Sequence, residues 1–112
     1  MKLLVLILNK EHLTEEVLEA FADGGIKGAT VIDSTGMARV IGDYHDGLFL
    51  GSLRKYLDRE RATNKTIFTV IEDDQTETVK KIITDVIGDL SKPDTGIVFT
   101  VPVDFVEGIQ KE

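Results

Sequence analysis

Small polar and basic side chains gather at two points of this 112-residue chain, each where a predicted strand meets a turn. The first point begins with Asp33-Ser34-Thr35-Gly36, and the backbone N–H groups of such a segment can form a nest that binds an anion. The candidate ligand-binding residues are Asp33, Ser34, Thr35, Gly36, Met37 and Arg39, with Lys92 and Gly96 in the second turn. The alternative is an ordinary strand-to-loop turn with solvated basic side chains.

A long connection, from Ser34 to Lys65, joins two predicted strands and far exceeds the roughly 2–5 residues of a hairpin loop. Its middle, Gly47–Leu57, is apolar at helical spacing. One side of that helix would carry either Phe49, Leu53 and Tyr56 or Leu50, Leu53 and Leu57. The candidate contacts to a partner protein are Phe49, Leu50, Leu53 and Tyr56. The alternatives are that the helix packs on its own assembly or lies on a membrane surface. We expect membrane contact only through a partner.

Residues for catalysis or metal binding are sparse. His12 and His45 are the only two histidines, and cysteine is absent. A site of His45 with Asp43 or Asp46 is conceivable, but one histidine with carboxylates is a thin ligand set for zinc. No Ser-His-Asp spacing, phosphate-binding glycine loop or paired-carboxylate motif stands out. We therefore predict no metal site and no catalytic residue.

The charge of the chain is unevenly divided. The net charge is −7, yet residues 34–65 hold six basic and four acidic side chains against seven and sixteen elsewhere. An acidic body argues against nucleic-acid binding, which depends on neutralising phosphates. The lack of cysteine fits a reducing cytoplasm, and the apolar run Leu3–Leu8 is too short for a signal peptide or a membrane span.

The elements that position these residues follow from hydrophobic periodicity. Strands are predicted over 3–8, 29–33, 66–72 and 97–103. The first helix begins at Thr14 as N-cap and ends at Gly24-Gly25; the second begins at Asp73 or Asp74 and keeps its apolar period to Leu90. The buried stripes are predicted to be Leu13, Val17, Leu18 and Phe21, then Val79, Ile82, Ile83, Val86, Ile87 and Leu90. Gly96 is expected to take a positive φ, and Pro102 to mark a strand end or an edge strand.

This order, β-α-β, long connection, β-α-β, predicts one α+β domain over residues 1–112. The commonest small solution is the ferredoxin-like β-α-β-β-α-β fold, with an antiparallel four-stranded sheet, the first and third strands central and both helices on one face. The first strand shows no polar alternation, although the second face of that sheet has no helix to cover it. We therefore expect a homo-oligomer built on sheet-to-sheet contact.

Two segments resemble the P-II nitrogen regulatory proteins. They are Ile26–Arg39, which is similar to the family's second strand and loop entrance, and Pro93–Val103, which is similar to its last strand. The long connection and the element order over 1–105 also match. The resemblance implies a homotrimer of ferredoxin-like subunits that binds effector nucleotides in clefts between subunits and presents its long loop to a target protein.

The chain departs from the family at the nucleotide site. Ile97 stands where the family has a lysine that contacts phosphate, and the usual arginines after the last strand are replaced by Glu107–Glu112. The turn reads Gly36-Met37-Ala38-Arg39-Val40, and the tyrosines lack the modification signature. Because an aliphatic side chain cannot neutralise a phosphate, these changes argue against ATP or ADP and leave the effector unknown.

The function predicted is that of a cytoplasmic P-II-like sensor in nitrogen regulation, not an enzyme. A small anionic or nucleotide effector binds at the inter-subunit cleft, and the 34–65 loop relays this to a partner protein. Two alternatives stay open: a metal-binding or small enzymatic protein on the CutA-like trimeric scaffold, and an adaptor that binds its partner without a ligand.

Overall fold

The structure is a computed structural model that describes residues 1–37 and 64–109. In chain order its elements are β1 (Lys2–Leu8), the 3-10 turn η1 (Glu11–Leu13), α1 (Thr14–Asp23), β2 (Thr30–Ser34), β3 (Asn64–Ile71), the 3-10 turn η3 (Asp73–Gln75), α4 (Thr76–Val86) and β4 (Gly96–Pro102). Every strand predicted from the sequence is present, with bounds shifted by one or two residues.

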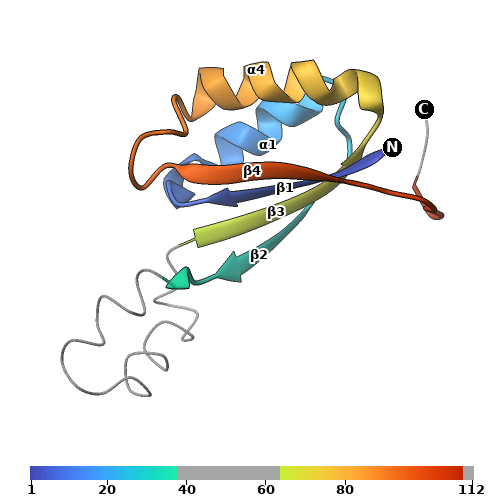
Figure 1. Cartoon of the computed structure of the whole chain (residues 1–112). Helices are drawn as coiled ribbons and strands as arrows, with labels where there is room; N and C mark the ends of the chain where they lie inside the picture. Colours follow the sequence, from blue (N-terminus) through green and yellow to red (C-terminus); the bar gives the residue numbers. More distant parts are fainter. Residues whose placement is uncertain (38–63, 110–112) are drawn as a thin grey trace.

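The four strands form one antiparallel sheet in the order β2-β3-β1-β4. Both helices lie on the same face of that sheet (Figure 1). The predicted α+β, ferredoxin-like fold with β1 and β3 in the centre is therefore confirmed. Pro102 ends β4 and lies on an edge strand, where its missing N–H breaks no ladder.

The core lies between the sheet and the two helices. Alternate residues of β1 and β3 point into it and meet the predicted apolar stripes of α1 and α4. Its buried members include Leu4, Leu6, Leu8, Val17, Phe21, Ile67, Ile71, Val79, Ile83 and Ile87. Leu13, Leu18, Ile82, Val86 and Leu90 pack against this core half-buried, so both predicted stripes are confirmed.

The starts of both helices differ from the prediction. Thr14 is the first residue of α1 rather than its cap, and its hydroxyl donates to the Glu11 carbonyl oxygen at 2.6 Å. Before α4, Glu72 and Gln75 form a reciprocal capping box around η3, so neither Asp73 nor Asp74 is the cap. In both cases a 3-10 turn precedes the helix, and single-residue capping preferences do not foresee such a turn.

The end of α4 and the following turn also correct the sequence reading. The helix ends at Val86 because Gly88 adopts a left-handed φ of 99°, although Leu90 still reaches the core. The left-handed non-glycine residue of the turn is Asp94, with φ 58°. Gly96, in β4, takes the expected positive φ, at 159°. A Cβ there would also stand 2.7 Å from the Ile7 carbonyl oxygen, so the close approach of β1 requires glycine as well.

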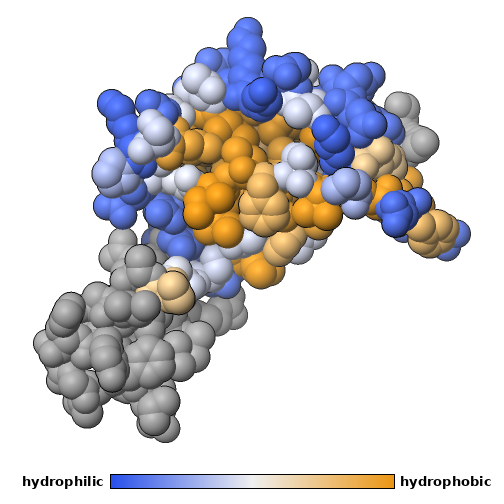
Figure 2. Space-filling view, in the orientation of Figure 1, coloured by the Kyte–Doolittle hydropathy of each residue, from blue (hydrophilic) through white to orange (hydrophobic). Residues whose placement is uncertain are grey.

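The sheet face opposite the helices, here called the open face, is apolar. It carries Val5 and the exposed side chains of Ile32, Ile97, Phe99 and Val101. Hydrophobic atoms gather over the strands below the hydrophilic surface of α4 (Figure 2). A face of this kind is unusual on a monomer and typical of a surface that another protein covers.

Within the described residues, no helix is long and apolar enough to cross a membrane.

Candidate functional site

The sheet register brings the two predicted parts of the site to one end of the sheet. Asp33 of β2 lies opposite Lys65 of β3, Lys65 lies opposite Leu8 of β1, and Leu8 lies opposite Gly96 of β4. Segments that are more than sixty residues apart in sequence therefore form one row. We call this row, with the residues just beyond it, the polar end.

The width of the polar end limits what can bridge it. Neighbouring strands lie about 4.8 Å apart, so β2 and β4, with two strands between them, are separated by about 14 Å. A single phosphate or carboxylate group cannot contact both Ser34 and Gly96. A ligand of nucleotide length can contact both residues, whereas a smaller anion can contact only the β2 side or only the β4 side.

On the β2 side, polar side chains join the strands. Asp33 and Lys65 form an ion pair, and the hydroxyls of Ser34 and Thr66 are 2.7 Å apart. Asp33, predicted as a ligand residue, is thus engaged by a lysine that sequence reasoning did not select. A charge of opposite sign directly across a strand pair was the available signal.

Beyond this pair the chain leaves the sheet. Gly36 lies against the buried Asn64, because a Cβ on Gly36 would stand 3.3 Å from the Asn64 side-chain nitrogen. Thr35 is half-buried, whereas Met37 is 75% exposed. The predicted ligand residue Arg39, the predicted partner contacts Phe49, Leu50, Leu53 and Tyr56, and His45 lie outside the described residues.

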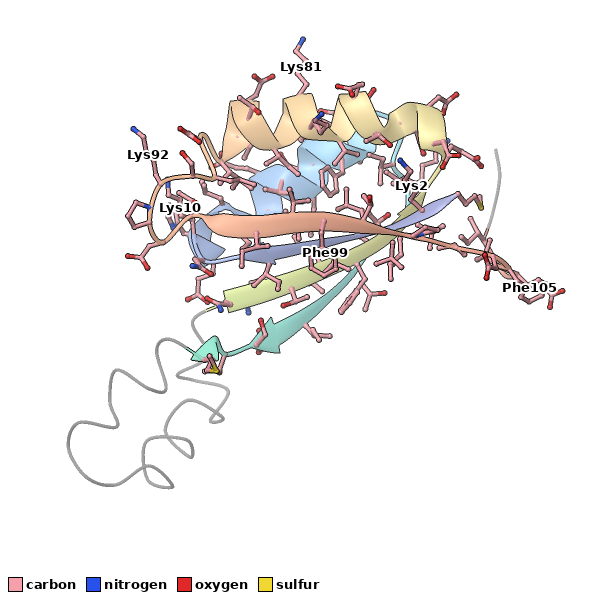
Figure 3. All side chains as sticks on the ribbon, in the orientation of Figure 1. Lys2, Lys10, Lys81, Lys92, Phe99 and Phe105 are labelled. Carbon is pink, nitrogen blue, oxygen red and sulfur yellow. The ribbon has the colours of Figure 1, made fainter. Side chains whose placement is uncertain are left out.

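On the β4 side, hydrogen bonds shape the turn before Gly96. The buried Thr95 hydroxyl lies 2.8 Å from the Lys92 carbonyl oxygen and 3.2 Å from that of Leu90, and the Thr95 carbonyl accepts the Asn9 N–H at 3.1 Å. Lys92 is exposed and points away from the sheet (Figure 3). Lys92 therefore does not face the row, and backbone groups near Thr95 are the nearer polar atoms.

The same turn yields a pH prediction. The Asp89 carboxylate accepts the Ser91 backbone N–H at 2.9 Å, and this bond, together with one from the Ser91 side chain, lowers the pKa of Asp89. A depressed folded-state pKa stabilises the turn above the unfolded pKa, and that stability is lost as pH falls through the folded value. In a carbon-detected NMR titration, we expect Asp89 to titrate below an unstructured aspartate. Ser91→Ala should return it only partway, because the backbone N–H remains.

A concave region lies at the opposite end of the sheet. It measures about 870 Å³ and is lined by Leu3 of β1, Phe68 and Val70 of β3, and the segment from Gly25 to Thr30 before β2. Sequence reasoning missed it, because segments distant in sequence supply its walls. Phe68, at the near side of this hollow, is three residues from Lys65 along β3, so about 10 Å separate the hollow from the polar end.

Metal-ligating side chains do not converge in the part of the chain that the structure describes. No group of three or more His, Asp or Glu side chains is arranged to hold an ion among residues 1–37 and 64–109. His12 is exposed on η1. The described polar side chains on the β2 side of the polar end are the Asp33–Lys65 ion pair and the hydroxyls of Ser34 and Thr66.

Comparison with known proteins places the chain in a family. Residues 1–112 match the family model described as nitrogen regulatory protein P-II. No curated protein matches the chain. The family match covers the whole sequence, including the segments on either side of the polar end.

Proposed function

The chain belongs to the family of P-II nitrogen regulatory proteins, and from this premise we propose that it senses a small anionic or nucleotide effector at a cleft between subunits. Proteins of the family are regulatory signal-transduction proteins rather than enzymes. The observation that carries the proposal is the sheet register, which sets Asp33 and Gly96 on one row at the polar end, with Ser34 just beyond it.

The cleft requires a second subunit. P-II proteins are generally trimers that contact partner proteins, and the exposed open face of this chain supplies an apolar surface for such packing. The polar end lies at one end of the sheet, and the hollow extends from Phe68 toward the other end. A head-to-tail arrangement around a three-fold axis would place the hollow of one subunit beside the polar end of the next, which gives a two-walled site.

The chemistry of the polar end bears on the effector. Ile97 is 60% exposed and shares the open face with Ile7, its partner in the strand register, so its side chain belongs to the packing surface. The phosphate contact that a lysine makes elsewhere in the family is therefore not supplied from this position. The groups available at the polar end are backbone N–H groups, hydroxyls and the Lys65 ammonium. Such hydrogen-bond donors suit a small carboxylate or phosphate ligand.

Effector binding is relayed by the 34–65 loop in this proposal. A ligand changes the loop only if it binds one loop arrangement more tightly than another. The ends of the loop, at Ser34 and Lys65, are held at the polar end, so a ligand bound there contacts both ends of the segment that meets the partner.

The test is a thermal-shift screen of the purified protein with nucleotides, bicarbonate, 2-oxoglutarate and divalent metals. A ligand that binds only the native assembly raises the melting temperature. A shift with an anion or nucleotide is the expected result. A shift with metal ions alone, and metal in the purified protein, would favour the metal-binding alternative. Partner capture that needs Leu53 but no ligand would favour the adaptor.

Replacement of Arg39 by alanine gives a second test. Arg39 lies outside the described residues, but it follows the Gly36 turn and carries the guanidinium group best suited to an anion. We expect Arg39→Ala to weaken binding of the effector identified in the screen by about tenfold, measured by calorimetry. Arg54→Ala, a charge-matched control in the same loop, should leave affinity unchanged. Equal affinity in Arg39→Ala and the unmodified chain would count against this site.

A further inference from the structure

The ion pair between Asp33 and Lys65 is the one feature of the polar end that places opposite charges across two strands. The two residues face each other directly in the β2–β3 register. Their side chains are 25% and 32% exposed, so most of each is removed from water. Asp33 is followed by Ser34, the last residue of β2, and Lys65 is the second residue of β3. The pair therefore sits where the long connection leaves and rejoins the sheet.

Partial burial makes each partner dependent on the other. A charge that has lost much of its hydration is stabilised by a counter-charge nearby, and removal of the Asp33 carboxylate takes this counter-charge from the Lys65 ammonium. An ammonium group in this situation accepts a different anion if that anion offers comparable contacts. The Asp33 carboxylate then occupies the position beside the Lys65 ammonium that an external anion would otherwise take.

Other lysines near this end are less suited to such a role. The Lys10 ammonium donates to the Ile87 carbonyl oxygen at 3.5 Å, beside the end of α4. Lys92 points away from the sheet into solvent (Figure 3). Among the described lysines, Lys65 alone lies within the row that connects Asp33 with Gly96.

We infer that Lys65 is an anion-binding residue of the polar end and that Asp33 is its internal competitor. An incoming phosphate or carboxylate takes the Lys65 ammonium from Asp33. The inference rests on the proposed function, because it names the group through which the effector of that site acts. It involves no covalent step.

Two opposite substitutions test the competition. Asp33→Asn keeps the shape of the side chain and removes its charge, so Lys65 becomes more available and affinity for inorganic phosphate and ATP should rise about threefold to tenfold. Lys65→Gln should lower affinity for the same probes by about tenfold. In the double variant the gain from Asp33→Asn should disappear. Calorimetric titration at fixed ionic strength measures all four proteins.

A matched control comes from α4. Glu77 and Lys80 form an exposed ion pair at 3.5 Å that is remote from the row. Glu77→Gln and Lys80→Gln change the net charge as Asp33→Asn and Lys65→Gln do, and they should leave phosphate and ATP affinity unchanged. An equal change in both sets would assign the effect to overall charge and overturn the inference.

A measurement on the unmodified protein guards against variants that do not fold. With nitrogen-15-labelled lysine, the Lys65 ammonium resonance should shift when phosphate or ATP is added, and the carboxyl carbon of Asp33 should shift with it. Probe binding without either shift, or binding that Asp33→Asn leaves unchanged, would overturn the inference and leave the sensor function standing. If neither probe nor any anion of the screen binds, the proposed function fails and the inference fails with it.

Discussion

Replacement of Phe99 by glutamate is expected to convert the assembly into monomers of 12.4 kDa, whereas the unmodified chain should have three times that mass. Phe99 lies opposite Val5 in the register, on the open face and midway along the edge strand β4, and is 46% exposed in the single chain. If three sheets pack face to face, each glutamate would be buried without a counter-charge at their common centre. The desolvation of each carboxylate costs several kcal/mol, and three like charges repel one another.

Light scattering coupled to size-exclusion chromatography measures this change directly. Thr100→Glu is the matched control, because Thr100 is the next residue of β4, is exposed and faces the other side of the sheet. It should leave the mass at the trimer value. A monomeric unmodified chain at micromolar concentration, or a Phe99→Glu variant that stays trimeric, would refute open-face packing.

Replacement of Gly96 by alanine is expected to lower the free energy of unfolding by about 2 kcal/mol. The added Cβ would stand 2.7 Å from the Ile7 carbonyl oxygen, a backbone atom of the neighbouring strand, so β4 must move away from β1. This movement would also displace Thr95 and disturb the turn that forms the β4 side of the polar end. Effector affinity should therefore fall together with stability.

Gly28→Ala is the control for that substitution, since a Cβ on Gly28 meets no atom within 4 Å. It should change the melting temperature little. Both variants should be melted at the same chain concentration, because the stability of an oligomer depends on concentration. A Gly96→Ala protein with the melting temperature of Gly28→Ala would show that β1 and β4 are not packed as described.

Much of the fold could be predicted because its signals are local. The period of Val79, Ile83 and Ile87 indicates a helix with one buried face whatever it packs against. The unbroken apolar run of β1 likewise indicates burial from both sides, and Val5 is 6% exposed even on the open face. Helix starts were less predictable, since the 3-10 turn and the Glu72–Gln75 capping box depend on several residues together.

The candidate site was predictable only in part. Asp33, Ser34 and Gly96 were selected by residue type, and the register brings them to one end of the sheet. Their roles as ligand residues stay predictions. The partners Lys65 and Thr66 were not selected, because a lysine and a threonine within a strand carry no motif of their own.

By itself, the sequence determined the order of elements, the apolar faces and the family, since hydrophobic periodicity and short motifs act over a few neighbouring residues. Only the tertiary structure decided which residues face one another. It paired Asp33 with Lys65, set Gly96 against Ile7 and assembled the walls of the hollow near Phe68 from segments distant in sequence. The physical reason is that strand register, fixed by long-range packing and hydrogen bonds, joins residues whose separation in sequence conceals their contact.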